Sequence, residues 1–122
     1  MAAWLCQDEM VRATRLIYVE NDPALRGIMT RAFEAAPEIE LLLSVGTSAE
    51  ALSFEGLGQA DAALLDLALG VGEVSGLDLG VAIRERNSDI GIVVYSQFSM
   101  RNLSRQVPPE QSMGWSFVPK SG

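Results

Sequence analysis

The sequence predicts an α/β fold, in which helices cover both faces of a doubly wound parallel sheet. Three features support this prediction: short apolar runs alternate with helical segments, the runs contain almost no polar residues, and most of them end in a polar side chain. Continuous apolar character is typical of strands that are buried on both faces of a parallel sheet. Strands that alternate with helices form such sheets through right-handed crossovers.

The first strand and the first helix have the clearest signals. Residues 16–19 read Leu-Ile-Tyr-Val, a short apolar run that predicts a buried strand. Asp22 and Pro23 follow as a helix N-cap and a first helical residue. Apolar residues then recur at helical spacing up to the residue before Pro37. They are Leu25, Ile28, Met29, Ala32, Phe33 and Ala36.

Further apolar runs predict four more strands. These runs cover residues 39–45, 62–67, 90–95 and 117–118. Between the first two of these strands, Thr47 and Glu50 have the spacing of a capping box, which predicts a short helix through about Phe54 that Gly56 and Gly58 close.

Two later segments also have helical character. Leu79, Ala82 and Ile83 mark a helix that Asn87 can end. A weaker helix around Leu103 must stop at the proline pair 108–109.

Composition bounds the class of protein. The chain has 122 residues, 48% of them hydrophobic, which is typical of one globular domain. A formal net charge of −7 argues against direct nucleic-acid binding. With one cysteine and no histidine, neither an internal disulfide nor a zinc site is expected. No apolar run approaches the roughly 20 residues that span a bilayer, and we expect a cytoplasmic protein that binds no membrane.

Polar residues stand where four of the predicted strands end. They are Glu20-Asn21-Asp22, Asp66, Ser96 and Lys120. The carboxyl ends of parallel strands share one edge of a sheet, which is where ligands bind. A buried Asp66 beside other acidic groups favours a divalent cation with oxygen ligands, and Mg²⁺ is the expected one. Ser96 and Lys120 could hydrogen-bond and neutralise an anion built on Asp66, as a phosphoryl-accepting carboxylate requires.

Four short segments in order resemble the response regulator receiver domains of bacterial two-component systems, the CheY-like family. They read YVENDP, ALLDLAL, VVYS and SFVPK, within a match from about Arg15 to Lys120. The resemblance implies a flavodoxin-like, five-stranded parallel sheet with strand order 2-1-3-4-5. It also implies a regulatory phosphoacceptor in phosphorelay signal transduction, and not an enzyme.

The resemblance implies a role for each matching residue. Asp66 takes the place of the phosphoacceptor, Ser96 and Lys120 stabilise the phosphoryl group, and Phe117 is the switch aromatic residue. Mg²⁺ is expected at Glu20, Asn21, Asp66 and the backbone carbonyl of Ala68.

Asn21 departs from the family, which usually has an aspartate there that binds the metal directly. The amide removes one negative charge, so Mg²⁺ is expected to bind weakly. Two interpretations therefore stay open: a phosphorylated receiver, or a pseudo-receiver that acts as a phosphorylation-independent interaction or dimerisation module. A third and weaker hypothesis is a small enzyme on the same sheet, but the sequence offers no glycine-rich phosphate loop.

The resemblance also suggests boundaries and partners. Residues 15–122 form the receiver domain, which ends at Gly122 without the family's last helix, and residues 1–14 are an extension that could form a helix on the open face. The expected partner is a histidine kinase or a phosphotransfer protein. A homodimer, and a DNA-binding output domain of the LuxR type beyond Gly122, are both compatible with the sequence.

Overall fold

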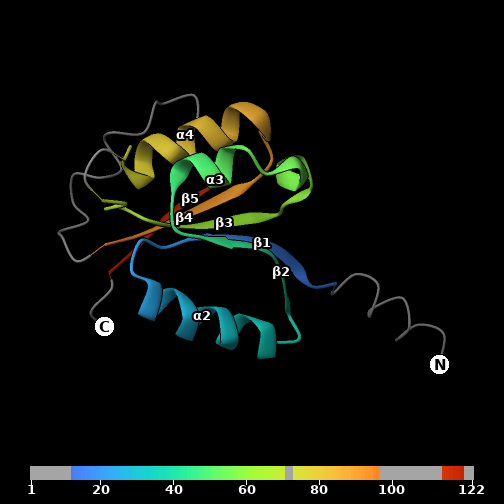
Figure 1. Cartoon of the computed structure of the whole chain (residues 1–122). Coiled ribbons are helices and arrows are strands. Elements are labelled where there is room, and N and C mark those ends of the chain that lie inside the picture. Colours follow the sequence, from blue (N-terminus) through green and yellow to red (C-terminus); the bar gives the residue numbers. More distant parts are fainter. Residues whose placement is uncertain (1–11, 71–72, 97–113, 120–122) are drawn as a thin grey trace.

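The computed structural model describes residues 12–70, 73–96 and 114–119, and it shows a three-layer α/β arrangement (Figure 1). The elements in chain order are β1 (Thr14–Val19), α2 (Pro23–Ala35), β2 (Ile39–Val45), α3 (Ser48–Leu52), the 3-10 helix η1 (Glu55–Gln59), β3 (Ala62–Asp66), α4 (Gly76–Arg86), β4 (Gly91–Ser96) and β5 (Trp115–Pro119). The predicted segment around Leu103 and the extension before residue 12 lie outside the described residues.

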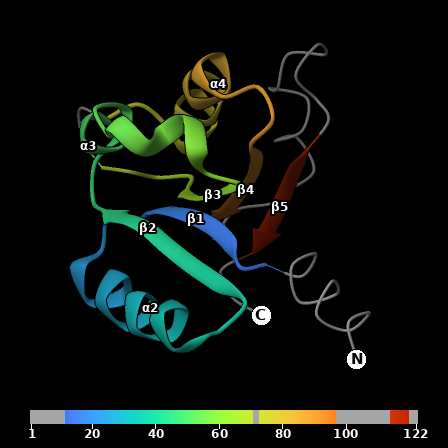
Figure 2. The same ribbon diagram turned by 90° about the vertical axis from the view of Figure 1, so that its right-hand side faces the viewer.

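All five strands form one parallel sheet in the order β2-β1-β3-β4-β5, as predicted. Helices α3, η1 and α4 lie on one face of the sheet (Figure 1). Helix α2 lies on the other face, beneath β2 and β1, and β5 forms the opposite edge (Figure 2). Among the described residues, no helix is both long and apolar enough to cross a membrane.

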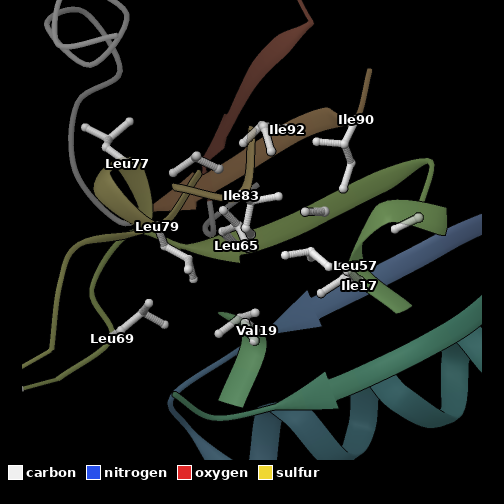
Figure 3. Close-up of a cluster of buried hydrophobic side chains, with 14 residues drawn as sticks. Ile17, Val19, Leu57, Leu65, Leu69, Leu77, Leu79, Ile83, Ile90 and Ile92 are labelled. Carbon is white, nitrogen blue, oxygen red and sulfur yellow. The ribbon is translucent and has the colours of Figure 1, made fainter. Parts of the chain in front are cut away.

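The main hydrophobic core lies between the sheet and the layer of α3 and α4 (Figure 3). Alternate residues of the strands point into it, and Ile17, Val19 and Leu65 are completely buried there. Tyr18 points to the other face, where the edge of its ring meets Phe33 of α2 at a centroid distance of 5.2 Å. Successive residues of β1 therefore point alternately to the main core and to the face covered by α2.

Side chains cap three of the helices at their first turns. The Asp22 carboxylate accepts a hydrogen bond from the N–H of Ala24 at 2.9 Å, which confirms the predicted start of α2. Thr47 caps α3 by accepting from the N–H of Glu50 at 3.2 Å. Ser75 caps α4 in the same way.

The predicted apolar stripe of α2 is wider than the one observed. Ile28 belongs to the predicted stripe, yet its side chain is 63% exposed, and α2 has no fully buried residue. The reason is the position of the helix, because α2 packs mainly on β2, an edge strand. A helix over the margin of a sheet buries a narrower strip than one over its centre.

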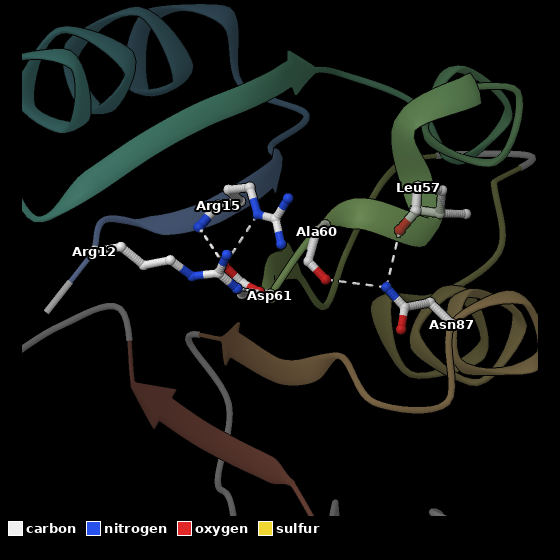
Figure 4. A network of polar contacts seen from close by, with 6 residues as sticks. All are labelled: Arg12, Arg15, Leu57, Ala60, Asp61 and Asn87. Carbon is white, nitrogen blue, oxygen red and sulfur yellow. Dashed lines mark hydrogen bonds and ion pairs between the residues drawn. The ribbon is translucent and has the colours of Figure 1, made fainter. Parts of the chain in front are cut away.

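The prediction that Gly56 and Gly58 close a helix is wrong. Both lie inside η1, which is held by a distant residue: the Asn87 amide donates to the carbonyl oxygens of Leu57 and Ala60, each at 3.0 Å (Figure 4). The carbonyl of Leu57 also accepts from the N–H of Ala60, so Asn87 holds the end of η1 at two successive acceptors. No local pattern contains this interaction.

A second polar contact closes the amino-terminal edge of the sheet (Figure 4). Asp61 accepts from the N–H of Arg15 at 2.9 Å and from its guanidinium at 3.4 Å, and Arg12 lies 3.7 Å away. The N–H of Arg15 is the main cause that lowers the pKa of Asp61, with the two guanidinium groups adding to it. Asp61 therefore joins β1 to the start of β3.

Candidate functional site

Three polar residues form a row across the carboxyl ends of adjacent strands. Val19 of β1 pairs with Leu65 of β3, and Asp66 of β3 pairs with Tyr95 of β4. Glu20 follows Val19 directly, so Glu20, Asp66 and Tyr95 lie side by side at one level of the sheet. Strand alternation turns this row away from the main core, toward the face that carries α2. Glu20 is completely buried and Asp66 is only 3% exposed.

Glu20 is held at its side chain and its backbone. Its Oε2 atom accepts from the N–H of Asp22 at 2.9 Å, and its Oε1 atom accepts from the hydroxyl group of Tyr95. Its own N–H donates to Val45 at 3.0 Å, and its carbonyl oxygen accepts from the Arg26 guanidinium at 2.7 Å. A buried carboxylate is stable only with such donors, and these bonds direct it into the fold.

Two tyrosine hydroxyl groups lie together beside this carboxylate. The hydroxyl oxygens of Tyr95 and Tyr18 are 3.2 Å apart. Burial is the main cause that raises the pKa of both groups, and the nearby charge of Glu20 raises it further. Both hydroxyl groups therefore stay protonated at neutral pH, and Tyr95 is the donor toward Glu20.

The start of α4 packs closely against the backbone of Asp66 and of the turn after β3. The Oδ1 atom of Asp66 accepts from the N–H of Ala68 at 3.1 Å, which fixes the rotation of the carboxylate. The first residue of α4, Gly76, donates to the carbonyl oxygen of Leu67 at 2.8 Å. A Cβ atom on Gly76 would lie 2.3 Å from the carbonyl oxygen of Asp66, so this approach requires glycine.

The loop that follows passes close to Asn21. Gly70 has a φ of +110°, and a Cβ atom there would lie 3.5 Å from the amide nitrogen of Asn21. Further along, the Glu73 carboxylate accepts from the N–H and the hydroxyl group of Ser48, at 2.9 and 2.8 Å. These two bonds lower the pKa of Glu73. They join the loop to the start of α3.

The structure brings part of the predicted site together. Glu20 and Asp66 share the row, and Asn21 and Ala68 are exposed in the turns after β1 and β3. Ser96 is the last residue of β4, and its backbone pairs with Pro119, directly before Lys120. Lys120 lies outside the described residues.

Phe117 lies in β5, half-buried against the main core. Its ring stacks with Trp115 at a centroid distance of 6.2 Å and an interplanar angle of 21°.

The donor atoms around Asp66 are of the type that Mg²⁺ takes. Within the described residues, no group of three or more His, Cys, Asp and Glu side chains is arranged to hold a metal ion. The carboxylates of Asp66 and Glu20, the amide of Asn21 and the carbonyl of Ala68 are nevertheless all hard oxygen donors. The set fits Mg²⁺ in chemistry, with one carboxylate already engaged by Tyr95.

Sequence reasoning missed Tyr95, Tyr18 and Gly76. A signal existed for the tyrosines: alternation along β1 places Tyr18 on the face of Glu20, and Tyr95 interrupts an apolar run with a hydroxyl group. Gly76 had no local signal, because its role follows from the contact with the backbone of Asp66.

Comparison with known proteins identifies the fold. No protein-family model matches the sequence, and no curated protein is significantly similar to it. Many solved structures do match. A LuxR-family two-component response regulator from Aurantimonas sp. has a TM-score of 0.74 at 18% identity, over 90% of this chain and 76% of that chain.

Two further structures illustrate the range of matches. A CheY-like response regulator receiver domain protein from Methanospirillum hungatei gives a TM-score of 0.70 at 16% identity, over 90% and 83% of the two chains. A response regulator from Burkholderia pseudomallei, with a phosphorylated aspartic acid and a calcium ion, gives 0.69 at 18% identity, over 89% and 61%. The chain therefore has the fold of response regulator receiver domains.

Proposed function

We propose that this chain is a receiver module of phosphorelay signal transduction that accepts a phosphoryl group on Asp66 and switches a protein-interaction face in response. The observation that carries the proposal is the place of Asp66, a buried carboxylate at the carboxyl end of the central strand with Glu20 beside it. In support, one solved structure with this fold carries a phosphorylated aspartic acid, and another is a receiver domain activated by BeF₃.

In the proposed reaction, an oxygen of the Asp66 carboxylate attacks the phosphorus atom of a phosphohistidine in the donor protein. The O–P bond forms, the P–N bond breaks, and the released imidazole nitrogen takes up a proton. The N–H of Ala68 holds Oδ1 of Asp66 and so orients the nucleophile. We assign Ser96 as a hydrogen-bond donor to the phosphoryl oxygens, and Lys120 as their counter-charge.

The metal and the switch are assigned by the same reasoning. We propose that Glu20, Asn21, Asp66 and the carbonyl oxygen of Ala68 hold Mg²⁺, which supplies positive charge for the transferred phosphoryl group. Phe117 is proposed to change its packing when Ser96 moves toward the phosphoryl group. Two conformations that differ by a few kcal/mol suffice for such a switch.

Beryllofluoride tests the site without turnover, because it mimics a phosphoryl group on a carboxylate. We expect amide NMR signals around Asp66, Ala68 and Gly76 to shift when beryllofluoride and Mg²⁺ are added together, and D66N to show no shift. A folded wild-type sample whose spectrum does not change in the presence of Mg²⁺ would refute the phosphoacceptor assignment.

One observation favours a second candidate, a pseudo-receiver that works without phosphorylation. Asn21 contributes no charge, and both carboxylate oxygens of Glu20 already accept hydrogen bonds, from Tyr95 and from the N–H of Asp22. The proposed metal site therefore offers a cation little negative charge. In that case the chain is an interaction or dimerisation module with a fixed surface. The variant N21D separates the two. If the chain is a pseudo-receiver, N21D gains a magnesium-dependent response that the wild type lacks; if it is a phosphorylated receiver, both respond.

The partners follow from the proposed role. The phosphodonor is a histidine kinase or a phosphotransfer protein, and we place the module in the cytoplasm as a regulatory domain, not an enzyme. Two solved structures with this fold are response regulators of the LuxR family, one of them described as DNA-binding. We propose that an output domain of this kind follows Gly122, with homodimers as a further form of the module.

A further inference from the structure

The hydrogen bond between Tyr95 and Glu20 spans the strand that ends in Asp66. Tyr95 is the direct partner of Asp66 on β4, whereas Glu20 directly follows β1, on the other side of β3. Neighbouring strands are about 4.8 Å apart, so the two backbones are separated by roughly 10 Å. The side chains can meet only by extending toward each other over the end of β3.

Tyr95 and Glu20 lie on either side of a buried acceptor residue. A strand-end carboxylate is ordinarily accessible to water, yet only 3% of Asp66 is exposed. Glu20 and the ring of Tyr95 flank it in the same row, and their side chains join across it. We call this buried row of Glu20, Asp66 and Tyr95 the acidic corner, and it is closed in the sense that Glu20 and Tyr95 are bonded across Asp66.

We propose that Tyr95 is a positioning residue that holds the acidic corner closed: its hydroxyl group keeps Glu20 turned inward over Asp66, and a divalent cation binds only when this bond is released. The inference rests on the proposed function of Asp66. It adds that the hydroxyl group of Tyr95 competes with the cation for the carboxylate of Glu20.

Electrostatics give the reason for competition. Two carboxylates in a buried row repel each other, and a donor or a cation must offset their charge. A phenol that donates to a carboxylate makes a charge-assisted bond, which is stronger than a neutral one. Tyr95 thus stabilises Glu20 in the absence of metal, and a cation that takes the Oε1 atom of Glu20 must replace that bond.

The released hydroxyl group has an alternative partner. The Tyr18 oxygen lies 3.2 Å from that of Tyr95, so Tyr95 can remain hydrogen-bonded after it leaves Glu20. Glu20 in turn keeps its bond from Asp22 through Oε2. Neither group is left buried without a partner, so both the closed and the open arrangement are accessible to the fold.

The composition of the chain makes the experiment specific. It contains two tyrosines, Tyr18 and Tyr95, and both belong to this cluster. Protein labelled with ¹³C at the tyrosine ring carbon that bears the oxygen should therefore give two signals, which Y18F assigns. On saturation with Mg²⁺ we expect the Tyr95 signal to shift, and calorimetry on the same samples gives the affinity.

The variant Y95F keeps the ring and removes the donor. We expect it to bind Mg²⁺ about tenfold more tightly than the wild type, the scale of one hydrogen bond to a charged group. Y18F is the matched comparison, since it removes a hydroxyl group of the same cluster that does not bond to Glu20. Because it also removes the partner of the released Tyr95, it should bind Mg²⁺ no more tightly than the wild type. Thermal unfolding of each variant reports whether it folds.

Two outcomes overturn the inference: Y95F that is folded and binds Mg²⁺ no more tightly than the wild type, or wild-type tyrosine signals that do not move at saturating Mg²⁺. If Y95F fails to fold, the wild-type tyrosine signals decide alone. A failure of the proposed function has a different signature. In that case no variant, including Y95F and N21D, takes up a phosphoryl group on Asp66, whatever its affinity for Mg²⁺.

Discussion

The hydroxyl group of Tyr95 donates a hydrogen bond to the carboxylate of Glu20 across the end of the strand that carries Asp66. This bond connects β4, whose last residue is Ser96, to the acidic turn after β1. Asn21, a proposed metal ligand, follows Glu20 at one end of this bond. Ser96, proposed to bind the phosphoryl group, follows Tyr95 at the other end. Metal binding at Glu20 should therefore alter the position of Tyr95 and Ser96, and movement of Ser96 should alter the position of Glu20.

Restoring a carboxylate at position 21 should strengthen metal binding. N21D adds a negative charge to the turn after β1, and we expect about tenfold tighter binding of Mg²⁺, measured by calorimetry. D22N is the matched control: it changes the neighbouring charge and keeps a side chain that can cap α2. Equal affinities for N21D and the wild type would show that Asn21 does not face the metal.

A methyl group at Gly76 should destabilise the turn around Asp66. The Cβ atom of G76A would overlap the carbonyl oxygen of Asp66, so we expect a loss of about 1–3 kcal/mol in the free energy of unfolding, measured in urea. G27A is the control, because nothing lies within 4 Å of a Cβ atom there and the residue is inside α2. It should gain about 0.5–1 kcal/mol from helix propensity. A G76A protein as stable as the wild type would contradict the close approach.

Acid should remove the contribution of Asp61. Its pKa in the folded chain lies below the ordinary value of 3.8, so the carboxylate stabilises the fold above that value. This stability is lost as the pH falls through the lowered pKa. We expect the wild type to be more stable than D61N near neutral pH, with the difference shrinking as the pH falls below 3.8 in urea unfolding curves. A difference that stays constant with pH would rule out this charge contribution.

Asn87 should hold η1 in place from a distance. N87A removes two hydrogen bonds to the carbonyl oxygens of Leu57 and Ala60, and we expect a loss of about 1–3 kcal/mol. Hydrogen exchange should become faster at the N–H of Ala60, which closes η1 by donating to Leu57. In N87D the side chain keeps its size but turns an acceptor toward both carbonyls, so it should also lose stability. Unchanged exchange in N87A would contradict the role.

Local sequence signals were sufficient for most of the fold. The strand over residues 39–45 was predicted with its observed bounds, and Asp22 and Thr47 cap their helices as expected. These features depend on neighbouring residues alone, namely an apolar run or a side chain that reaches its own helix. The strand order followed from the resemblance, and the observed pairing confirms it.

The features that could not be predicted depend on tertiary contacts. Asn87 stabilises η1 from 30 residues away, and the exposure of Ile28 follows from the position of α2 over an edge strand. For the candidate site, the sequence placed Glu20 and Asp66 at one edge of the sheet. It did not show that Tyr95 reaches Glu20, because that bond requires the lateral register of β1, β3 and β4.

Intact-protein mass spectrometry after incubation with acetyl phosphate shows whether Asp66 accepts a phosphoryl group. We expect the wild type to gain the mass of one phosphoryl group in the presence of Mg²⁺, and to gain none after the metal is chelated. D66N, folded as judged by its thermal unfolding, should gain none under either condition. A folded wild type that gains no mass with Mg²⁺, or a D66N protein that gains as much as the wild type, would rule out Asp66 as the phosphoacceptor.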